Sequence, residues 1–215
     1  MNDVPLYIVA TPIGNLEDIT LRALKILENV DIIAAEDTRE SKKLLDKYNI
    51  SKKLISYHVH NEEQSAKNII NLILNGKTIA LISDSGMPLI SDPGYEIINL
   101  AHKNNIKISI CPGANAAISA LVLSGFSTRR FVFEGFLPSS KKDRTAIIES
   151  LKNEKRTVIF YEAPHRVQRF LKEFCDILGK DRKIAIIREI TKVFEEIKIG
   201  TLGEMQKHYS ENEPR

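Results

Sequence analysis

Short apolar runs alternate with amphipathic segments through the first half of the chain. The apolar runs predict buried strands over 6–10, 31–37, 54–57, 78–82 and 106–110. Between them, apolar residues that recur every three or four positions predict helices over 21–27, 40–48, 62–74 and 95–100. Alternating strands and helices of these lengths are typical of a mostly parallel sheet that is covered by helices on both faces.

The pattern changes after about residue 118. A helix of small residues over 114–123 leads into strands over 131–137, 156–161, 183–189 and 193–199, with helices over 141–151, 167–178 and 202–209. A tight turn separates the last two strands, which favours an antiparallel pair. We therefore expect an α/β protein with two domains, 1–118 and 119–215, in which the first sheet is mostly parallel and the second is mixed.

The composition suits a globular protein with real hydrophobic cores. The chain has 215 residues, 43% of them hydrophobic, and a formal net charge of +3. This charge excludes a uniformly cationic coat for nucleic acid but not a local basic patch. No apolar run approaches the ~20 residues of a membrane span, and we see no signal peptide. Cys111 and Cys175 lack metal-type spacing, so we expect reduced thiols in a cytoplasmic protein.

The stretch 83–94, Ser-Asp-Ser-Gly-Met-Pro-Leu-Ile-Ser-Asp-Pro-Gly, is the main candidate for a functional loop. It is too rich in turn-forming residues to be a helix or a strand. It follows a predicted buried strand, and ligands of open α/β sheets bind beside the loops at the carboxyl ends of strands. Two interpretations stay open, a ligand-binding loop and an ordinary long connection.

Two carboxylates, Glu36 and Asp37, end the second predicted strand. A dinucleotide-binding fold keeps its ribose carboxylate near this place. The first strand, however, is followed by Thr-Pro-Ile-Gly-Asn, which has one glycine and is no G-x-G-x-x-G fingerprint. A nicotinamide-dependent oxidoreductase is therefore a distant alternative, and a solvated strand end is as good an interpretation.

Histidines and charged residues gather at other strand ends. His58, His60 and Glu62 suggest a metal site, but no second metal motif supports it, so we favour a polar loop and expect no metal. In the second half, charged groups crowd the predicted strand exits and favour a cleft between two domains. These groups are Glu162, His165, Arg166, Arg188, Glu189 and Lys192.

A basic cluster surrounds the predicted domain junction and the helix that follows it. Its members are Arg129, Arg130, Lys141, Lys142, Arg144, Lys152 and Lys155. Such a run is usually a solvated helix face. It is also suited to a phosphate backbone, and we assign RNA contacts to the first five residues of the cluster.

Several motifs occur together and in order along nearly the whole chain. They are Val-Ala-Thr-Pro-Ile-Gly-Asn-Leu at 9–16, Ala-Ala-Glu-Asp-Thr-Arg at 34–39, the 83–94 loop, Cys-Pro-Gly-Ala-Asn-Ala at 111–116, and Phe-Tyr-Glu-Ala-Pro-His-Arg at 160–166. With them the chain resembles the tetrapyrrole methylase superfamily of class III S-adenosylmethionine-dependent methyltransferases, on its branch that acts on ribosomal RNA.

The resemblance implies two αβα domains that bind S-adenosylmethionine in a cleft. It implies methyl transfer to the 2′-hydroxyl of a cytidine in the decoding region of 16S rRNA by a homodimer without a metal. The cofactor positions that it carries over are Pro12, Ile13, Met87, Ile90, Gly113, Ala114, Asn115, Ala116, Ala117 and Tyr161. We add Gly14, Asp84 and Gly86, which lie in the same loops. Glycine and alanine permit a close backbone approach to a ligand.

The acceptor side has its own set of candidates. We assign it Glu36, Asp37, Arg39, His165, Arg188 and Glu189. For Asp37, the alternative is a cap on the helix that follows it. Family members continue past the last helix with another strand, so we expect the second domain to lack that strand. The other functions that stay open are methylation of a corrinoid or siroheme precursor and RNA binding without catalysis.

Overall fold

The computed structural model describes residues 4–57 and 62–212. The chain divides into two compact units, Met1–Ala116 and Ala117–Arg215. Each unit has its own sheets and its own hydrophobic core. Within the described ranges, no helix is long and apolar enough to cross a membrane. Cys111 and Cys175 are both free and buried.

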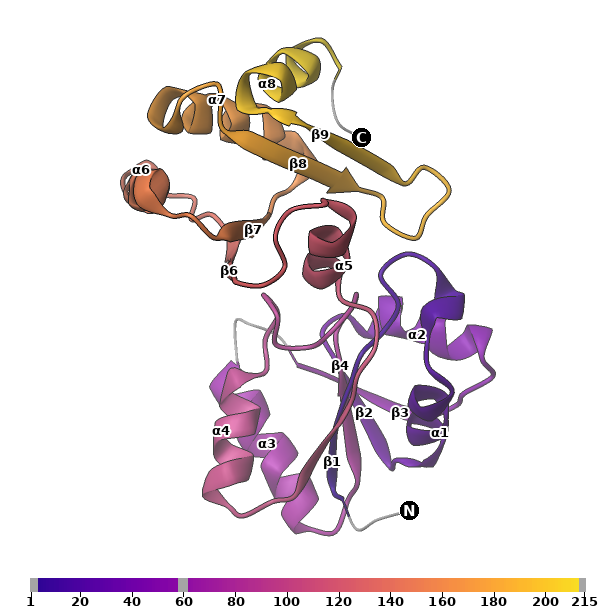
Figure 1. Cartoon of the computed structure of the whole chain (residues 1–215). Helices are drawn as coiled ribbons and strands as arrows, with labels where there is room; N and C mark the ends of the chain where they lie inside the picture. Colours follow the sequence, from indigo (N-terminus) through magenta and orange to yellow (C-terminus); the bar gives the residue numbers. More distant parts are fainter. Residues whose placement is uncertain (1–3, 58–61, 213–215) are drawn as a thin grey trace. The chain divides into compact units, whose positions relative to one another are not determined.

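The first unit is built on a five-stranded sheet (Figure 1). Its strands are β1 (Leu6–Val9), β2 (Ile32–Ala35), β3 (Lys53–Ser56), β4 (Ile79–Ile82) and β5 (Ile108–Cys111). Its helices are η1 (Leu16–Asp18), α1 (Leu21–Asn29), α2 (Thr38–Lys47), α3 (Glu62–Leu74) and α4 (Tyr95–Lys103). The strand order is β3-β2-β4-β1-β5 and every neighbouring pair is parallel, so the prediction of a mostly parallel first sheet is confirmed.

Helices cover both faces of this sheet, in agreement with Figure 1. Side chains of α1 and α2 form one core with residues such as Val9 and Ile33, and those of α3 and α4 form another with Leu6 and Leu81. All four residues of β2 and of β4 are buried. Because the strands are parallel, their carboxyl ends meet at one edge, where the loops after β1, β2, β4 and β5 emerge together.

The second unit contains the remaining elements. Its strands are β6 (Phe131–Phe136), β7 (Thr157–Tyr161), β8 (Lys183–Arg188) and β9 (Glu196–Thr201). Its helices are α5, which starts at the boundary (Ala116–Leu123), α6 (Lys141–Ser150), η3 (Leu151–Asn153), η4 (Pro164–Arg166), α7 (Val167–Leu178) and α8 (Leu202–Glu211). The main core forms between α6, α7 and α8, around Ile148, Leu171 and Leu202.

Both strand orientations occur in the second unit, as a mixed sheet requires, but they belong to two separate sheets. β6 and β7 form a parallel pair, and β8 and β9 an antiparallel pair. A groove of about 790 Å³ lies along β7 and β8, lined by consecutive residues of both strands (156–160 and 183–189). The two pairs are therefore not joined edge to edge in the described part of the chain.

The last strand begins later than its sequence predicts. Val193 and Phe194 read as strand residues but lie in the connection between β8 and β9, where 92% and 75% of their surface is exposed. Glu189 and Thr191 adopt left-handed backbone conformations, and the Glu195 carboxylate accepts the Thr191 amide. This local geometry turns the chain before pairing resumes at Glu196.

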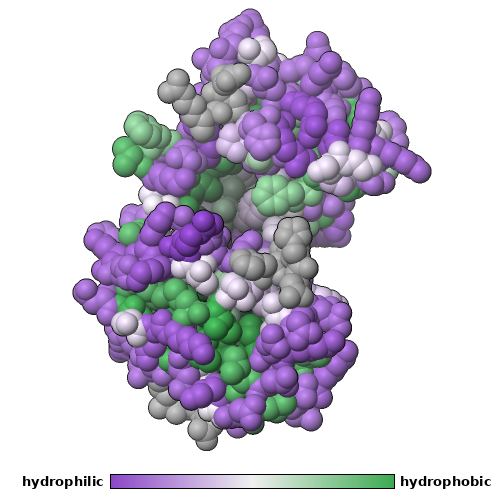
Figure 2. Space-filling view, turned by 180° about the vertical axis from the view of Figure 1, so that it is seen from behind, coloured by the Kyte–Doolittle hydropathy of each residue, from purple (hydrophilic) through white to green (hydrophobic). Residues whose placement is uncertain are grey.

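Apolar side chains also reach the surface of the first unit. Seen from behind, this unit shows an apolar area among hydrophilic residues (Figure 2). The exposed large apolar residues of the first unit, on all of its faces, include Leu16, Leu21, Leu74, Tyr95 and Ile110. Leu21 lies outside the buried face of α1, which consists of Ala23, Ile26 and Leu27.

Candidate active site

Backbone hydrogen bonds join the loops after β1 and β4. The Thr11 amide donates to the Gly86 carbonyl at 2.8 Å, and the Gly86 amide donates to the Thr11 carbonyl at 3.1 Å. The buried Thr11 hydroxyl lies 3.1 Å from the Ser83 carbonyl that it donates to, and the Ser83 hydroxyl donates to Gly86 at 3.2 Å. The hydrogen bonds among Thr11, Ser83 and Gly86 therefore hold the two strand exits together, and we call these three residues the floor of the site.

Three loops converge at Gly86. A Cβ atom at this position would lie 3.1 Å from Cγ2 of Ile13 and 3.5 Å from the carbonyl oxygen of Ala114. Gly86 also has a φ of +84°, a conformation that favours glycine. The structure thus brings together residues of the loops after β1, β4 and β5 that the sequence assigns to the cofactor.

Gly113 has a packing role of its own. A Cβ at this position would lie 2.9 Å from Cβ of Ala10, closer than real side chains pack. The Ala10 amide donates to the Cys111 carbonyl at 3.1 Å, which holds the β5 exit against β1. The glycine is therefore needed for the fold of this loop, whether or not a ligand approaches it.

Asp37 caps α2. Its Oδ1 accepts the Arg39 amide at 2.8 Å, and its two oxygens accept Nε and an Nη of Arg39 at 3.1 and 2.7 Å. The side-chain and backbone hydrogen bonds from Arg39 lower the pKa of the Asp37 carboxyl. The helix-cap alternative thus describes what this carboxylate does, and Arg39 holds it ionised.

Asp84 joins the ends of β2 and β4. Its Oδ1 accepts the Asp37 amide at 2.9 Å, across two neighbouring parallel strands. Glu36 lies half-buried at the same strand end. The structure therefore places Asp84, expected at the cofactor, beside the two carboxylates expected at the acceptor.

The segment between Gly86 and Gly94 is strained. Leu89 and Ser91 have φ values of +71° and +69°, which residues other than glycine adopt rarely. Burial raises the pKa of the Asp92 carboxyl, and the charge of Asp84 raises it further. Ile90, assigned to the cofactor, is exposed in this segment. Strain of this kind often accompanies ligand-binding loops.

In the second unit, Tyr161 is tied to the start of α5. Its hydroxyl accepts the Ala117 amide at 3.1 Å. The Phe133 ring packs edge-on against the Tyr161 ring with centroids 5.1 Å apart, and Phe136 packs against it at 5.4 Å. The two expected cofactor residues Ala117 and Tyr161 are thus brought together.

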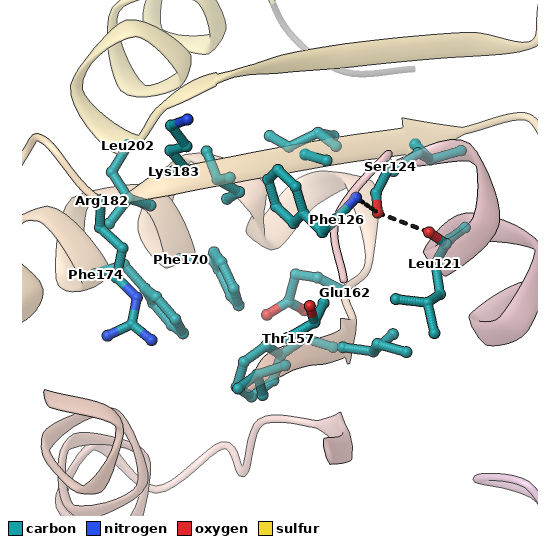
Figure 3. Close-up of a pocket in the computed structure, with 18 of the residues that line it drawn as sticks. Leu121, Ser124, Phe126, Thr157, Glu162, Phe170, Phe174, Arg182, Lys183 and Leu202 are labelled. Carbon is teal, nitrogen blue, oxygen red and sulfur yellow. Dashed lines mark hydrogen bonds between the residues drawn. The ribbon is translucent and has the colours of Figure 1, made fainter. Parts of the chain in front are cut away.

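The groove along β7 and β8 was missed by sequence reasoning. Phe126, Phe170, Phe174 and Glu162 are among the residues that line it (Figure 3). Arg188 and Glu189 also line it. No local pattern could predict it, because it results from two strands that lie near each other without pairing.

The remaining acceptor candidates are at the exits of β7 and β8. His165 is exposed in η4. The Arg188 guanidinium donates to the Glu196 carboxylate across the β8–β9 pair, and the Lys192 ammonium lies 3.0 Å from Glu189. Arg188 and Glu189 therefore already hold ion-pair partners within their own hairpin.

The predicted RNA contact at Arg144 is wrong. Its side chain is only 5% exposed, and its guanidinium forms two hydrogen bonds with Glu173, at 2.5 and 2.7 Å. It also donates to the carbonyls of Pro138 and Ser139 at 3.1 and 2.8 Å. Because all these contacts are internal, Arg144 organises the start of α6 and cannot reach a phosphate.

The other basic residues do not form one cluster. Arg129 and Arg130 precede β6, whereas Lys141 and Lys142 follow it, and all four are exposed. A strand of six residues spans roughly 20 Å, so the two pairs lie at opposite ends of β6. The β6–β7 register places Phe131 beside Thr157, so Arg130 and Arg156 directly precede a pair of facing residues.

His58 and His60 lie outside the described residues. Across 4–57 and 62–212, no group of three or more His, Cys, Asp or Glu side chains is placed to hold a metal ion. Glu62 does have a defined role, as the acceptor of two backbone amides at the start of α4. The position of Glu62 at the start of a predicted helix suggests a capping role, but the amides that it accepts come 32 and 34 positions later in the sequence.

Comparison with known proteins identifies the family. Residues 5–206 match the model of the Tetrapyrrole (Corrin/Porphyrin) Methylases. Over 199 residues the chain is 53% identical to Ribosomal RNA small subunit methyltransferase I of Halalkalibacterium halodurans, which covers 93% of this chain and 68% of the relative. The protein of the same name from Thermotoga maritima is 46% identical over 209 residues, 97% of this chain and 93% of the relative.

The chain belongs to the tetrapyrrole methylase family, on the branch of the ribosomal RNA small subunit methyltransferases I. Solved structures of other proteins share its fold at low identity. A diphthine synthase matches with a TM-score of 0.74 and 16% identity over 94% of this chain and 83% of that chain. A cobalt precorrin-4 methyltransferase matches with 0.72 and 18% over 98% and 90%. The expected fold class and family are thereby confirmed.

Proposed function

We propose that this protein uses S-adenosylmethionine to methylate the 2′-hydroxyl of a cytidine in the decoding region of 16S rRNA. The observation that carries the proposal is identity of 46–53%, over nearly the whole chain, to relatives named for methylation of small-subunit ribosomal RNA. The solved structures at 16–18% identity support only the fold, so they give no comparable support for a tetrapyrrole substrate.

The convergent loops of the first unit suit S-adenosylmethionine. Ile13, Gly86 and Ala114 meet within van der Waals distance of one point, and the glycine there leaves space that any other residue would fill. Exposed Gly14 and Ile90 border the same loops. We assign them the cofactor, which supplies an electrophilic methyl group on a sulfonium when bound. The floor of hydrogen bonds between Thr11 and Gly86 holds these loops in place.

The chain's own residues have three tasks in methyl transfer. They must align the attacking oxygen, exclude water and accept a proton from the hydroxyl. Glu36 is our candidate for the proton acceptor, because it is half-buried beside Asp84 at the same edge of the sheet. Asp37 and Arg39, bound to each other and to α2, position that strand end. The roles of His165, Arg188 and Glu189 stay predictions.

Exposed arginines and lysines of the second unit are the candidates for RNA contacts. Arg129 and Arg130 lie at one end of β6, and Lys141 and Lys142 at the other. Charge reversal of either pair should weaken RNA binding and flatten its dependence on salt, because fewer counterions are released. Binding of S-adenosylmethionine should not change. An unchanged salt slope would mean that the reversed pair is a solvated surface.

We also propose a homodimer that acts in the bacterial cytoplasm without a metal. Light scattering on a gel-filtration column should give twice the mass of the chain. Methylation should persist after dialysis against a chelator. A monomeric mass with full activity would remove the dimer from the proposal.

Calorimetry and a competition assay test the reaction class. We expect saturable binding of S-adenosylmethionine, and turnover with small ribosomal subunits that a siroheme precursor does not inhibit. Turnover with the tetrapyrrole in place of RNA would favour the alternative substrate. If the protein binds RNA but not S-adenosylmethionine, it is an RNA-binding module without catalysis.

A further inference from the structure

We propose that Glu62 is a positioning residue for the loop Met87–Pro93, and that Tyr57 orients its carboxylate. This inference rests on the proposed function, because two residues of that loop, Met87 and Ile90, are assigned to S-adenosylmethionine. It concerns contacts inside the first unit only.

The helix after the loop cannot cap itself. Gly94 is the N-cap residue of α4 and has no side chain to accept the free amides of the first turn. Its φ of +144° favours glycine, and a Cβ there would lie 2.7 and 2.8 Å from side-chain atoms of Leu89. A capping Ser, Thr, Asp or Asn is therefore excluded at this position.

Glu62 supplies the missing cap from another helix. It is the first residue of α3, and its Oε1 accepts the Gly94 amide at 2.9 Å and the Glu96 amide at 3.4 Å. The Tyr57 hydroxyl donates to the same oxygen at 3.1 Å. Tyr57 is buried, and burial and the Glu62 charge raise its pKa, so the hydroxyl remains a donor. A carboxylate is also favoured at a helix N-terminus by the helix dipole.

The loop is thus fixed at both ends. At Gly86 it is held by the pair of hydrogen bonds to Thr11, and at Gly94 by Glu62. Between these anchors, Leu89 and Ser91 have strained left-handed conformations, and such conformations persist only where the surroundings enforce them. Removal of the Glu62 anchor should let the segment relax and should disturb the exposed Ile90 more than the floor at Gly86.

The test compares Glu62 with its neighbour. Glu63 lies at the next position of α3 and forms an exposed ion pair with Lys67, so Glu63→Ala is a matched control. We would measure hydrogen exchange of 87–93, the Kd for S-adenosylmethionine by calorimetry, and the melting temperature. We expect Glu62→Ala to speed exchange in this segment and to raise the Kd at least tenfold. Glu63→Ala should leave both unchanged.

Milder variants guard against loss of folding. Glu62→Gln keeps an acceptor oxygen but loses the charge, and Tyr57→Phe removes only the donor, so each should raise the Kd several-fold. The KM for S-adenosylmethionine should rise while kcat at saturation stays within about twofold.

Folded variants with unchanged Kd and unchanged exchange would overturn the inference, even if their melting temperatures fall. If the wild-type protein itself binds no S-adenosylmethionine, the proposed function fails. Exchange in 87–93 still decides separately whether Glu62 anchors the loop.

Discussion

Replacement of Arg144 separates a structural role from an RNA contact. The Glu173 side chain is 20% exposed in the wild-type protein; in Arg144→Met it loses its ion-pair partner, and two carbonyls lose their donor. Removal of one partner from a buried ion pair costs about 3–5 kcal/mol. Since Glu173 keeps some contact with water, we expect about 3 kcal/mol, near the lower limit, and a melting temperature lower by roughly 6–12 °C.

The assay pairs this variant with Lys142→Ala, which removes an exposed charge from the same helix. Denaturant unfolding should show the loss for Arg144→Met and no change for Lys142→Ala. RNA binding would then be titrated at several salt concentrations. If Lys142 contacts one phosphate, the slope of log K against log salt concentration should fall in magnitude by about 0.7–0.9 in Lys142→Ala. For folded Arg144→Met the slope should not change.

The same pair predicts a pH dependence. Hydrogen bonds from Arg144 lower the pKa of Glu173 below its ordinary value of 4.5. A lowered carboxyl pKa stabilises the folded state above the unfolded pKa, and this stabilisation is lost as pH falls through the folded value. The stability gap between wild type and Arg144→Met should therefore be full at pH 7 and should narrow below about pH 4.5. A variant with wild-type stability and a reduced salt slope would refute the structural role.

Three further predictions concern the strand ends. Gly86→Ala should weaken S-adenosylmethionine binding, because the new methyl group fills the point where three loops meet. The control Gly76→Ala has nearly the same φ (+82°) but nothing within 4 Å, so it should lower only stability. Calorimetry separates the two variants, and equal affinities of both for S-adenosylmethionine would remove Gly86 from the site. Glu36→Gln should slow single-turnover methylation by roughly 10²–10⁴ with unchanged cofactor affinity, as expected for loss of a general base. Asp37→Asn should chiefly lower the melting temperature, because Asp37 caps α2. If Glu36→Gln or Asp37→Asn instead loses its affinity for the cofactor, the replaced carboxylate binds the cofactor ribose.

Local signals in the sequence predict most of the elements. The bounds of α3 and α7 agree with those predicted, and α7 ends at Gly179, whose positive φ of +86° favours glycine. Thr20 caps α1 through the Ala23 amide. Helix caps and helix ends depend on residues that lie within one or two helical turns of each other, so they can be predicted from the sequence alone.

Contacts between distant residues could not be predicted in this way. Arg144 reads as a surface cation because its partner, Glu173, comes 29 positions later. Glu62 reads as a metal-ligand candidate because the amides that it accepts belong to another helix. The convergence at Gly86 was predictable only in outline, since parallel strands bring their exits to one edge but do not determine which atoms meet there.

The most direct test of the proposed function is to locate the transferred methyl group. Small ribosomal subunits that lack the modification would be incubated with the protein and labelled S-adenosylmethionine, and the 16S rRNA would be digested and mapped by mass spectrometry. We predict one 2′-O-methylated cytidine in the decoding region, absent when Gly86→Ala replaces the wild-type protein. Label on a base, on an RNA segment outside the decoding region, or on no RNA at all would contradict the account.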